Sequence, residues 1–136
     1  MEYVSLVALG AVALAVALAL ACARRGSVRR RFAVSMAGRT PLNAADFASL
    51  FPGAEGSAVA VRQAVATAVP GDGRLMRPLD RICKDLMVDA MDGLNTNEIV
   101  VKLERRFSIS IPDARASEVR TVQDLVDLVQ SLRDGI

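Results

Sequence analysis

Few side chains in this sequence have the types and spacing that catalysis or metal binding requires. Histidine, the commonest general base and metal ligand, is absent from the 136 residues. Cys22 lies in an apolar run and Cys83 stands alone, so the sequence has neither a disulfide framework nor a Cys-x-x-Cys metal pair. As a nucleophile, Cys83 would need Arg81 or Lys84 to stabilise its thiolate. We expect Cys83 to be a small buried apolar residue instead, in a protein that is not an enzyme.

Two aspartates and two glycines complete the set of candidate sites. Asp89 and Asp92 precede a predicted helix, but two carboxylates fall short of the about six to eight oxygen ligands that calcium prefers. We expect these carboxylates to favour the positive end of that helix. Gly71 and Gly73 are not followed by the Gly-Lys-Ser/Thr of a phosphate-binding loop. The sequence therefore predicts neither a metal site nor a bound cofactor.

The N-terminal residues have the composition of a membrane anchor. Residues 3–23 carry no charge, and about 20 apolar residues are enough to cross the hydrocarbon of a bilayer. Residues 1–23 are therefore predicted to form a transmembrane helix. A signal peptide cleaved near Ala21-Cys22-Ala23 is the alternative, but signal peptides carry positive charge before the apolar run, and this chain carries it afterwards. Gly10 and the many alanines would let a second helix pack closely against this one.

An arginine-rich segment follows the apolar run. Residues 24–42, interpreted as a basic juxtamembrane linker, contain no acidic residue, and we expect them to attract anionic lipid head groups. The arginines concerned are Arg24, Arg25, Arg29, Arg30 and Arg31. Arginines at the cytoplasmic face orient a membrane helix, which predicts a single-pass protein of the cell inner membrane with its C-terminal domain in the cytoplasm. Phe32 alone interrupts the arginines as an aromatic residue, so we expect no nucleic-acid partner.

From residue 43 onward the apolar residues recur at helical spacing. Asn43 followed by Asp46 is typical of a helix N-cap, and the short helix that it opens should stop at Pro52-Gly53. A longer helix is predicted over about 55–69, ahead of a Pro-Gly-Asp-Gly run. In the loop that follows, four aliphatic residues should hold the chain against the core. They are Leu75, Leu79, Ile82 and Leu86.

Three further helices are predicted after this loop. One begins at Asn95, with Glu98 completing a capping box, and continues to Phe107. A short helix covers about 113–119, and the last helix opens at Thr121 with Asp124 in its box. The last helix should bury Val122, Leu125, Val126, Val129 and Leu132. The fold class predicted for residues 43–136 is all-α, a compact antiparallel bundle of four helices, preceded by one transmembrane helix.

Two segments of this C-terminal part resemble the acyl carrier protein family. They are Phe107-Ser108-Ile109-Ser110-Ile111-Pro112-Asp113 and Thr121-Val122-Gln123-Asp124-Leu125-Val126. The similarity covers about Glu55 to Leu132, and the order and spacing of the two segments carry it. The resemblance implies an acyl-carrier-like four-helix bundle. It also implies a serine, in an Asp-Ser-Leu motif at the start of the second main helix, that is esterified to phosphopantetheine.

The attachment serine of that family is missing here. An ungapped count back from Phe107 places the motif on Asp92-Gly93-Leu94, so that Gly93 takes the serine position. A register set by the upstream Asp85-Leu86 places the motif on Asp89-Ala90-Met91 instead, which also lacks serine. Thr96 is the nearest hydroxyl, in the first turn of the predicted helix, and threonine is not the attachment residue of the family.

The charge of the second main helix also departs from the family, whose carriers usually present an acidic helix to their enzymes. Here Glu98 and Glu104 are mixed with Lys102, Arg105 and Arg106, so the usual enzymes are not expected as partners. The face that meets partners in the family corresponds to Asp92, Gly93, Leu94, Ile99 and Lys102. We expect an adaptor or accessory subunit of a membrane complex that meets a protein partner there. A functional carrier modified at an atypical residue, and a purely structural subunit, are the alternatives.

Overall fold

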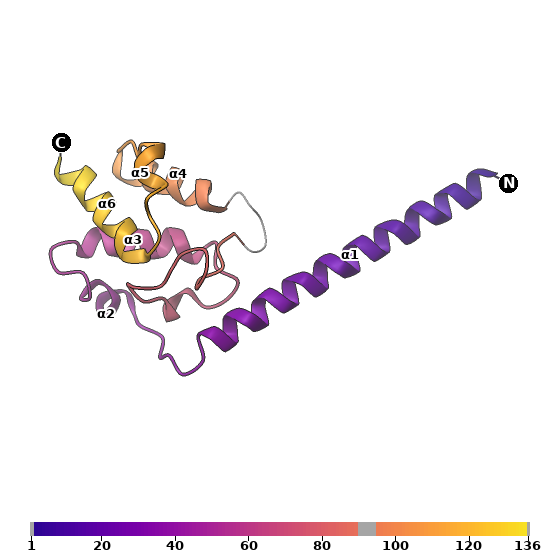
Figure 1. Cartoon of the computed structure of the whole chain (residues 1–136), viewed down its shortest axis with the longest axis horizontal. Coiled ribbons are helices and arrows are strands. Elements are labelled where there is room, and N and C mark those ends of the chain that lie inside the picture. The colour runs from indigo at the N-terminus through magenta and orange to yellow at the C-terminus, as the bar shows by residue number, and fades with distance from the viewer. Residues whose placement is uncertain (1, 90–94, 136) are drawn as a thin grey trace.

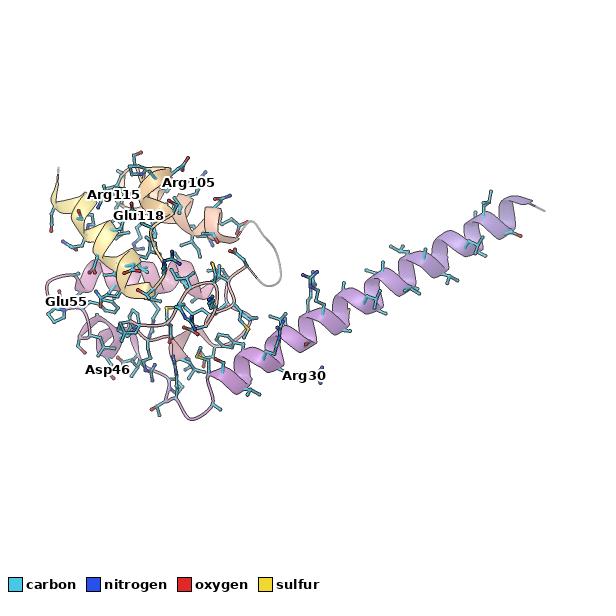
Figure 2. All side chains as sticks on the ribbon, in the orientation of Figure 1. Arg30, Asp46, Glu55, Arg105, Arg115 and Glu118 are labelled. Carbon is cyan, nitrogen blue, oxygen red and sulfur yellow. The ribbon has the colours of Figure 1, made fainter. Side chains whose placement is uncertain are left out.

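The first helix is long and apolar at its N-terminal end. The computed structural model describes residues 2–89 and 95–135. Helix α1 (Glu2–Ser35) contains a candidate membrane span, Ser5–Ser35, whose most apolar window has a mean hydropathy of 2.7 and no buried residue. Side chains of its outer part stand clear of the rest of the protein (Figure 2). The helix does not end at residue 23, because the predicted linker 24–42 is helical as far as Ser35.

The remainder is a helical domain built around one central helix. Helix α3 (Glu55–Ala66) packs against α2 (Ala44–Ala48), α4 (Asn95–Phe107), α6 (Val122–Asp134) and the 3-10 turn η1 (Gly73–Leu75). Short helix α5 (Asp113–Ala116) lies between α4 and α6 in the chain, as Figure 1 shows. The three longer helices α3, α4 and α6, with the short α5, confirm the predicted all-α four-helix bundle, and α2 is a further short helix. The described residues contain no strand.

The core forms because each main helix has one apolar face. Helix α3 contributes small residues such as Ala58 and Ala60 beside Val61 and Val65, while α6 contributes Val122, Leu125, Val126 and Val129, as predicted. Small side chains on α3 let its neighbours approach closely, and this placement suits its central position. Leu132 is half-buried against the same cluster. Charged residues such as Arg105 and Arg115 project outward (Figure 2).

Helix boundaries follow the capping residues where those residues are described. The Thr121 hydroxyl accepts from the Asp124 N–H, and the Asp124 carboxylate accepts from the Thr121 N–H, so the predicted capping box is confirmed. Asn43 caps α2 through the N–H of Asp46, also as predicted. Helix α3 ends at Ala66 rather than at 69, and α5 ends at Ala116 rather than at 119. The predicted partnership of Asn95 with Glu98 lies outside the described side chains.

The loop between α3 and α4 is anchored differently from the prediction. Ile82 and Leu86 are buried and Leu75 is half-buried, as expected, but Leu79 is 79% exposed, so its predicted role in the core is wrong. The reason is the neighbouring Asp80, which is 5% exposed. Its carboxylate accepts from the Arg77 N–H, and its own N–H donates to the Arg77 carbonyl. These two bonds close a turn in which the Leu79 side chain lies outside. Met76 and Val88, both fully buried, take the apolar positions instead.

Candidate functional site

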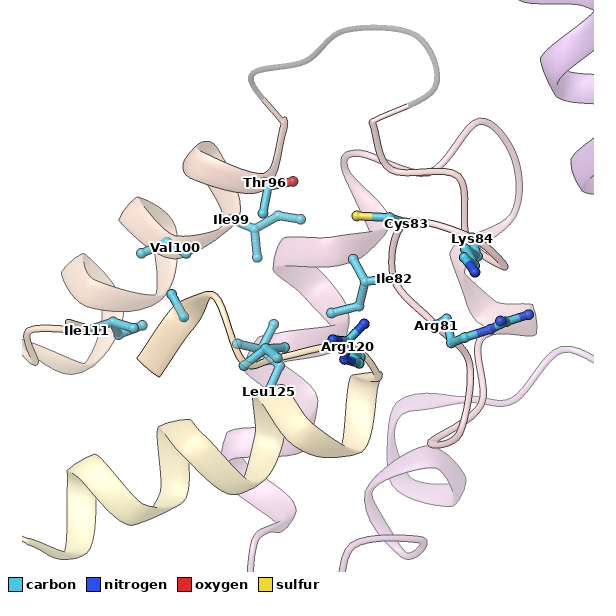
Figure 3. A pocket seen from close by; sticks show the side chains of 12 residues that line it. Arg81, Ile82, Cys83, Lys84, Thr96, Ile99, Val100, Ile111, Arg120 and Leu125 are labelled. Carbon is cyan, nitrogen blue, oxygen red and sulfur yellow. The ribbon is translucent and has the colours of Figure 1, made fainter. Parts of the chain in front are cut away.

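An apolar cavity of about 450 Å³ opens between α4, α6, the 81–84 segment and the residues that follow α5 (Figure 3). Its walls are mostly aliphatic, and its polar residues gather at one end. The lining residues are Arg81, Ile82, Cys83, Lys84, Thr96, Ile99, Val100, Ile111, Ala116, Val119, Arg120 and Leu125. The 81–84 wall is held by the main chain, because the Ile82 N–H donates to the Arg120 carbonyl at 2.9 Å. A cavity with this lining suits an apolar ligand that carries a polar end.

Three polar side chains meet at the open end of the cavity. Figure 3 shows the Thr96 hydroxyl and the Cys83 sulfur pointing toward one another. Both donate to Asp89: the Thr96 Oγ1 to Asp89 Oδ1 distance is 2.7 Å, and the Cys83 Sγ to Asp89 Oδ2 distance is 3.2 Å. Asp89 thus ties the segment before α4 to the first turn of α4. Each oxygen of the Asp89 carboxylate therefore accepts one of these hydrogen bonds.

Cys83 is exposed, and its predicted burial as an apolar residue is therefore wrong. Cysteine is often buried because it behaves as a small apolar side chain, but here the polar partner Asp89 holds the thiol at the cavity mouth. Partial desolvation, together with the hydrogen bond and the negative charge of Asp89, raises the pKa of the Cys83 thiol. A raised pKa lowers the thiolate fraction near neutral pH, so this environment does not activate a nucleophile.

The described residues of the predicted partner-binding face differ in their exposure to solvent. Lys102 is exposed on α4, and its Nζ donates to the Thr67 hydroxyl at 2.8 Å, just after the end of α3. Ile99 is 3% exposed and faces the cavity, so its side chain lies behind the surface rather than on it. Asp92, Gly93 and Leu94 lie outside the described residues. Of the predicted face, the structure therefore places Lys102 on the exterior.

Metal ligands are not gathered in the described part of the chain, which holds no group of three or more His, Cys, Asp or Glu side chains. Among the ion pairs that the described residues form, the one between Arg39 and Asp80 joins segments far apart in the sequence and was missed by the sequence analysis. Arg39 donates to both carboxylate oxygens of Asp80, at 2.6 and 2.8 Å. The Asp80 carboxylate raises the pKa of Arg39 through this hydrogen bond. A buried Asp far from Arg39 in sequence leaves no local signal by which the pair could be found.

Comparison with known proteins adds the last observation. No family model matches the chain. Curated proteins do match, and three of them carry the name "Acyl carrier protein". The protein of Helicobacter hepaticus is 34% identical over 71 residues, which are 52% of this chain and 90% of that protein. Those of Thermosynechococcus vestitus and Campylobacter concisus are each 31% identical, over 52% and 53% of this chain and over 84% and 90% of their own length.

Proposed function

This chain belongs to the acyl carrier protein family, and we propose that it is a membrane-anchored, non-catalytic adaptor that has lost the prosthetic-group site. The observation that carries the proposal is Gly93, which stands where the ungapped register of the family has its attachment serine. Glycine has no side-chain oxygen to esterify. The segment between Leu86 and α4 is also longer than the family pattern. A carrier-like fold without the attachment residue is suited to holding a partner rather than to transferring an acyl group.

The candidate span in α1 supports the membrane part of the proposal. Arginines follow the apolar run directly, and arginines at that place favour retention on the cytoplasmic side. We therefore place the protein in the cell inner membrane as a single-pass protein, with the helical domain in the cytoplasm. Anionic lipid head groups are the expected partners of Arg24, Arg25, Arg29, Arg30 and Arg31.

A working carrier that is modified at an atypical residue is the second candidate. Thr96 favours it, because its hydroxyl lies at the mouth of the apolar cavity and donates to a carboxylate, Asp89, that could accept a proton. Against it, Thr96 lies within the first turn of α4, and threonine is not the attachment residue of the family. Cys83 is a still poorer residue for attachment of the prosthetic group, because the pKa of its thiol is raised.

Intact mass separates the two candidates. The full chain is co-expressed with a phosphopantetheinyl transferase, and a carrier with an intact serine motif is the positive control. We expect the unmodified mass for the wild-type chain and an added phosphopantetheine for the Gly93→Ser variant. An adduct on the wild type that disappears in Thr96→Ala would establish the carrier. A Gly93→Ser variant that stays unmodified would instead contradict the register on which the adaptor proposal depends.

The adaptor role predicts a protein partner on the exposed face of α4 that carries Lys102. Lys102→Glu reverses a charge on that surface, and like charges across an interface cost affinity. We expect this variant to lose the membrane proteins that co-purify with the wild-type chain in mild detergent. Arg115→Glu is the matched control, since it makes the same charge reversal at an exposed arginine on α5 rather than on α4. Equal recovery of the same proteins with Lys102→Glu would show that the partner binds elsewhere.

A further inference from the structure

The last part of α1 is packed into the helical domain. Val28 and Phe32 in α1, and Met36 directly after its last residue, lie four residues apart and are 1%, 2% and 2% exposed. Four-residue spacing puts them on one face of the helix. Phe32 and Met36 belong to the same buried cluster as the cores of α3, α4 and α6. Apolar residues nearer the N-terminus, such as Leu14 and Leu20, are exposed. One continuous helix therefore has an uncovered apolar part and a part that belongs to the domain.

The segment that joins α1 to α2 is fixed as well. Arg39 is paired with Asp80 through both guanidinium nitrogens. The Leu42 carbonyl accepts from Arg62 Nη1 on α3 at 2.7 Å, and the Leu42 N–H donates to the Arg74 carbonyl at 3.0 Å. These bonds hold the joining segment to α3 and to the loop after it. No free length of chain is left between the candidate span and the domain.

The helix geometry then sets how close the domain lies to a bilayer. Val28 follows Ala23, the end of the uncharged run, by about 8 Å along the axis, because an α-helix rises about 1.5 Å per residue. The head-group layer on each side of a bilayer is about 5–8 Å thick. Contact between α1 and the domain thus begins where the head groups end. Arg24 and Arg25 lie between these two points, at the depth of the head-group layer in this arrangement.

One edge of the domain is turned toward α1. Figure 3 shows Lys84 and Arg81 on the side of the cavity nearest α1, whose ribbon crosses the upper right corner. Arg81 is paired with Asp85, and Asp89 is occupied by Cys83 and Thr96. Lys84 is exposed, and within the described residues its amino group has no hydrogen bond or ion pair. Within residues 2–89 and 95–135, no carboxylate forms an ion pair with this positive charge.

We infer that α1 holds the domain in one fixed orientation on the membrane, with the edge that carries Lys84 against anionic lipid head groups. The inference rests on the proposed membrane anchoring and adds that the anchor is a rigid mount rather than a flexible tether. A rigid mount keeps the mouth of the apolar cavity at the bilayer surface. A flexible tether of the same length would instead let every face of the domain contact the bilayer.

The two native cysteines allow a direct test, because Cys22 lies in α1 and Cys83 in the domain. Both are exposed and can carry nitroxide labels. Pulsed electron resonance on the full chain, reconstituted in phosphatidylglycerol-containing nanodiscs, then measures the distance between them. We expect a single narrow distribution. Gly26→Pro should broaden it severely, because proline breaks a helix interior and Gly26 lies between the uncharged residues 3–23 and the buried Val28. Gly26→Ala should leave it narrow, since a Cβ at Gly26 meets nothing within 4 Å.

The membrane anchoring and the rigid mount are contradicted by different experimental outcomes. A chain released from membranes by alkaline carbonate would contradict the proposed anchoring. A chain that is retained, but whose wild-type distances are as broad as those of Gly26→Pro, would contradict the rigid mount alone. Thermal unfolding of Gly26→Pro is recorded in parallel, because an unfolded domain would broaden the distances for another reason. An unchanged melting temperature assigns the broadening to the break in α1.

Lipid contact is tested on the Cys22→Ala variant labelled at Cys83, next to Lys84. Lipids that carry a nickel chelate on the head group should enhance relaxation of this label in vesicles containing phosphatidylglycerol. Lys84→Glu should reduce the enhancement, and so should replacement of phosphatidylglycerol by phosphatidylcholine. Arg115→Glu is the control, since Arg115 lies on α5 and outside this edge. An enhancement that is independent of both changes would overturn the assignment of the Lys84 edge.

Discussion

Replacing Phe32 by alanine should destabilise the domain by about 3–5 kcal/mol, the usual cost of removing a buried aromatic ring. Phe32 is 2% exposed and lies in the main core cluster. For a domain of this size the melting temperature should fall by more than about 10 °C, measured on the full chain in detergent by circular dichroism. Val34→Ala, at a position that is 77% exposed on the same helix, should change stability by less than about 0.5 kcal/mol.

Substitution of Gly71 tests more specifically how Phe32 packs against the domain. A Cβ at Gly71 would lie 2.5 Å from Phe32 Cδ1, which is closer than side chains can approach. Gly71→Ala should therefore destabilise the wild-type protein by about 1–3 kcal/mol through overpacking. In a Phe32→Ala background the ring is gone, and the same substitution should cost much less. Equal costs in the two backgrounds would mean that Phe32 does not lie against Gly71.

Much of the domain was predictable because its signals are local. The cap at Thr121 and the valine and leucine spacing of α6 need no knowledge of the rest of the chain, and both predictions are confirmed. The similarity to acyl carrier proteins, first seen in the segments after Phe107, is likewise confirmed. Element ends were less accurate, since the point at which α3 stops depends on how the following loop packs against it.

The end of α1 was harder to predict. Val28, Phe32 and Met36 have helical spacing, but they stand among arginines, and the charge favoured a solvated linker. Their burial depends on a surface formed by residues far along the chain, including Gly71. The exposure of Leu79 also depends on residues far apart in the chain. An apolar residue in a loop is expected to be buried, but here the neighbouring Asp80 is buried through its pair with Arg39.

The candidate site was predictable in its chemistry but not in its shape. The absence of histidine and of a cysteine pair could be read directly, and Gly93 was found by counting. The cavity could not be found in this way, because Ile82, Ile99 and Leu125 reach it from three separate elements. Cys83 was predicted to be buried because cysteine often is, whereas its side chain is held at the cavity mouth by Asp89.

Replacing Asp80 by alanine should destabilise the domain by about 2–3 kcal/mol, since it leaves the half-buried Arg39 guanidinium and the Arg77 N–H without their shared acceptor. Asp80 and Arg39 side chains are 6% and 30% exposed. The Asp80 carboxylate also accepts the Arg77 N–H at 2.8 Å. Alanine would remove all of these acceptors, which hold the joining segment to the loop. Urea unfolding of the full chain in detergent, followed by circular dichroism, measures the loss.

Three comparisons make this expectation specific to the buried pair. Asp80→Asn keeps one acceptor oxygen and should lose less than alanine does. Arg81→Ala removes an exposed pair, with Arg81 and Asp85 side chains 53% and 31% exposed, and should cost at most about 1 kcal/mol. The Arg39→Ala/Asp80→Ala double variant should be more stable than the sum of the single losses predicts, because contacting partners are coupled. Strictly additive losses would mean that Arg39 and Asp80 do not stabilise one another, and the joining segment would then be held by its main-chain bonds alone.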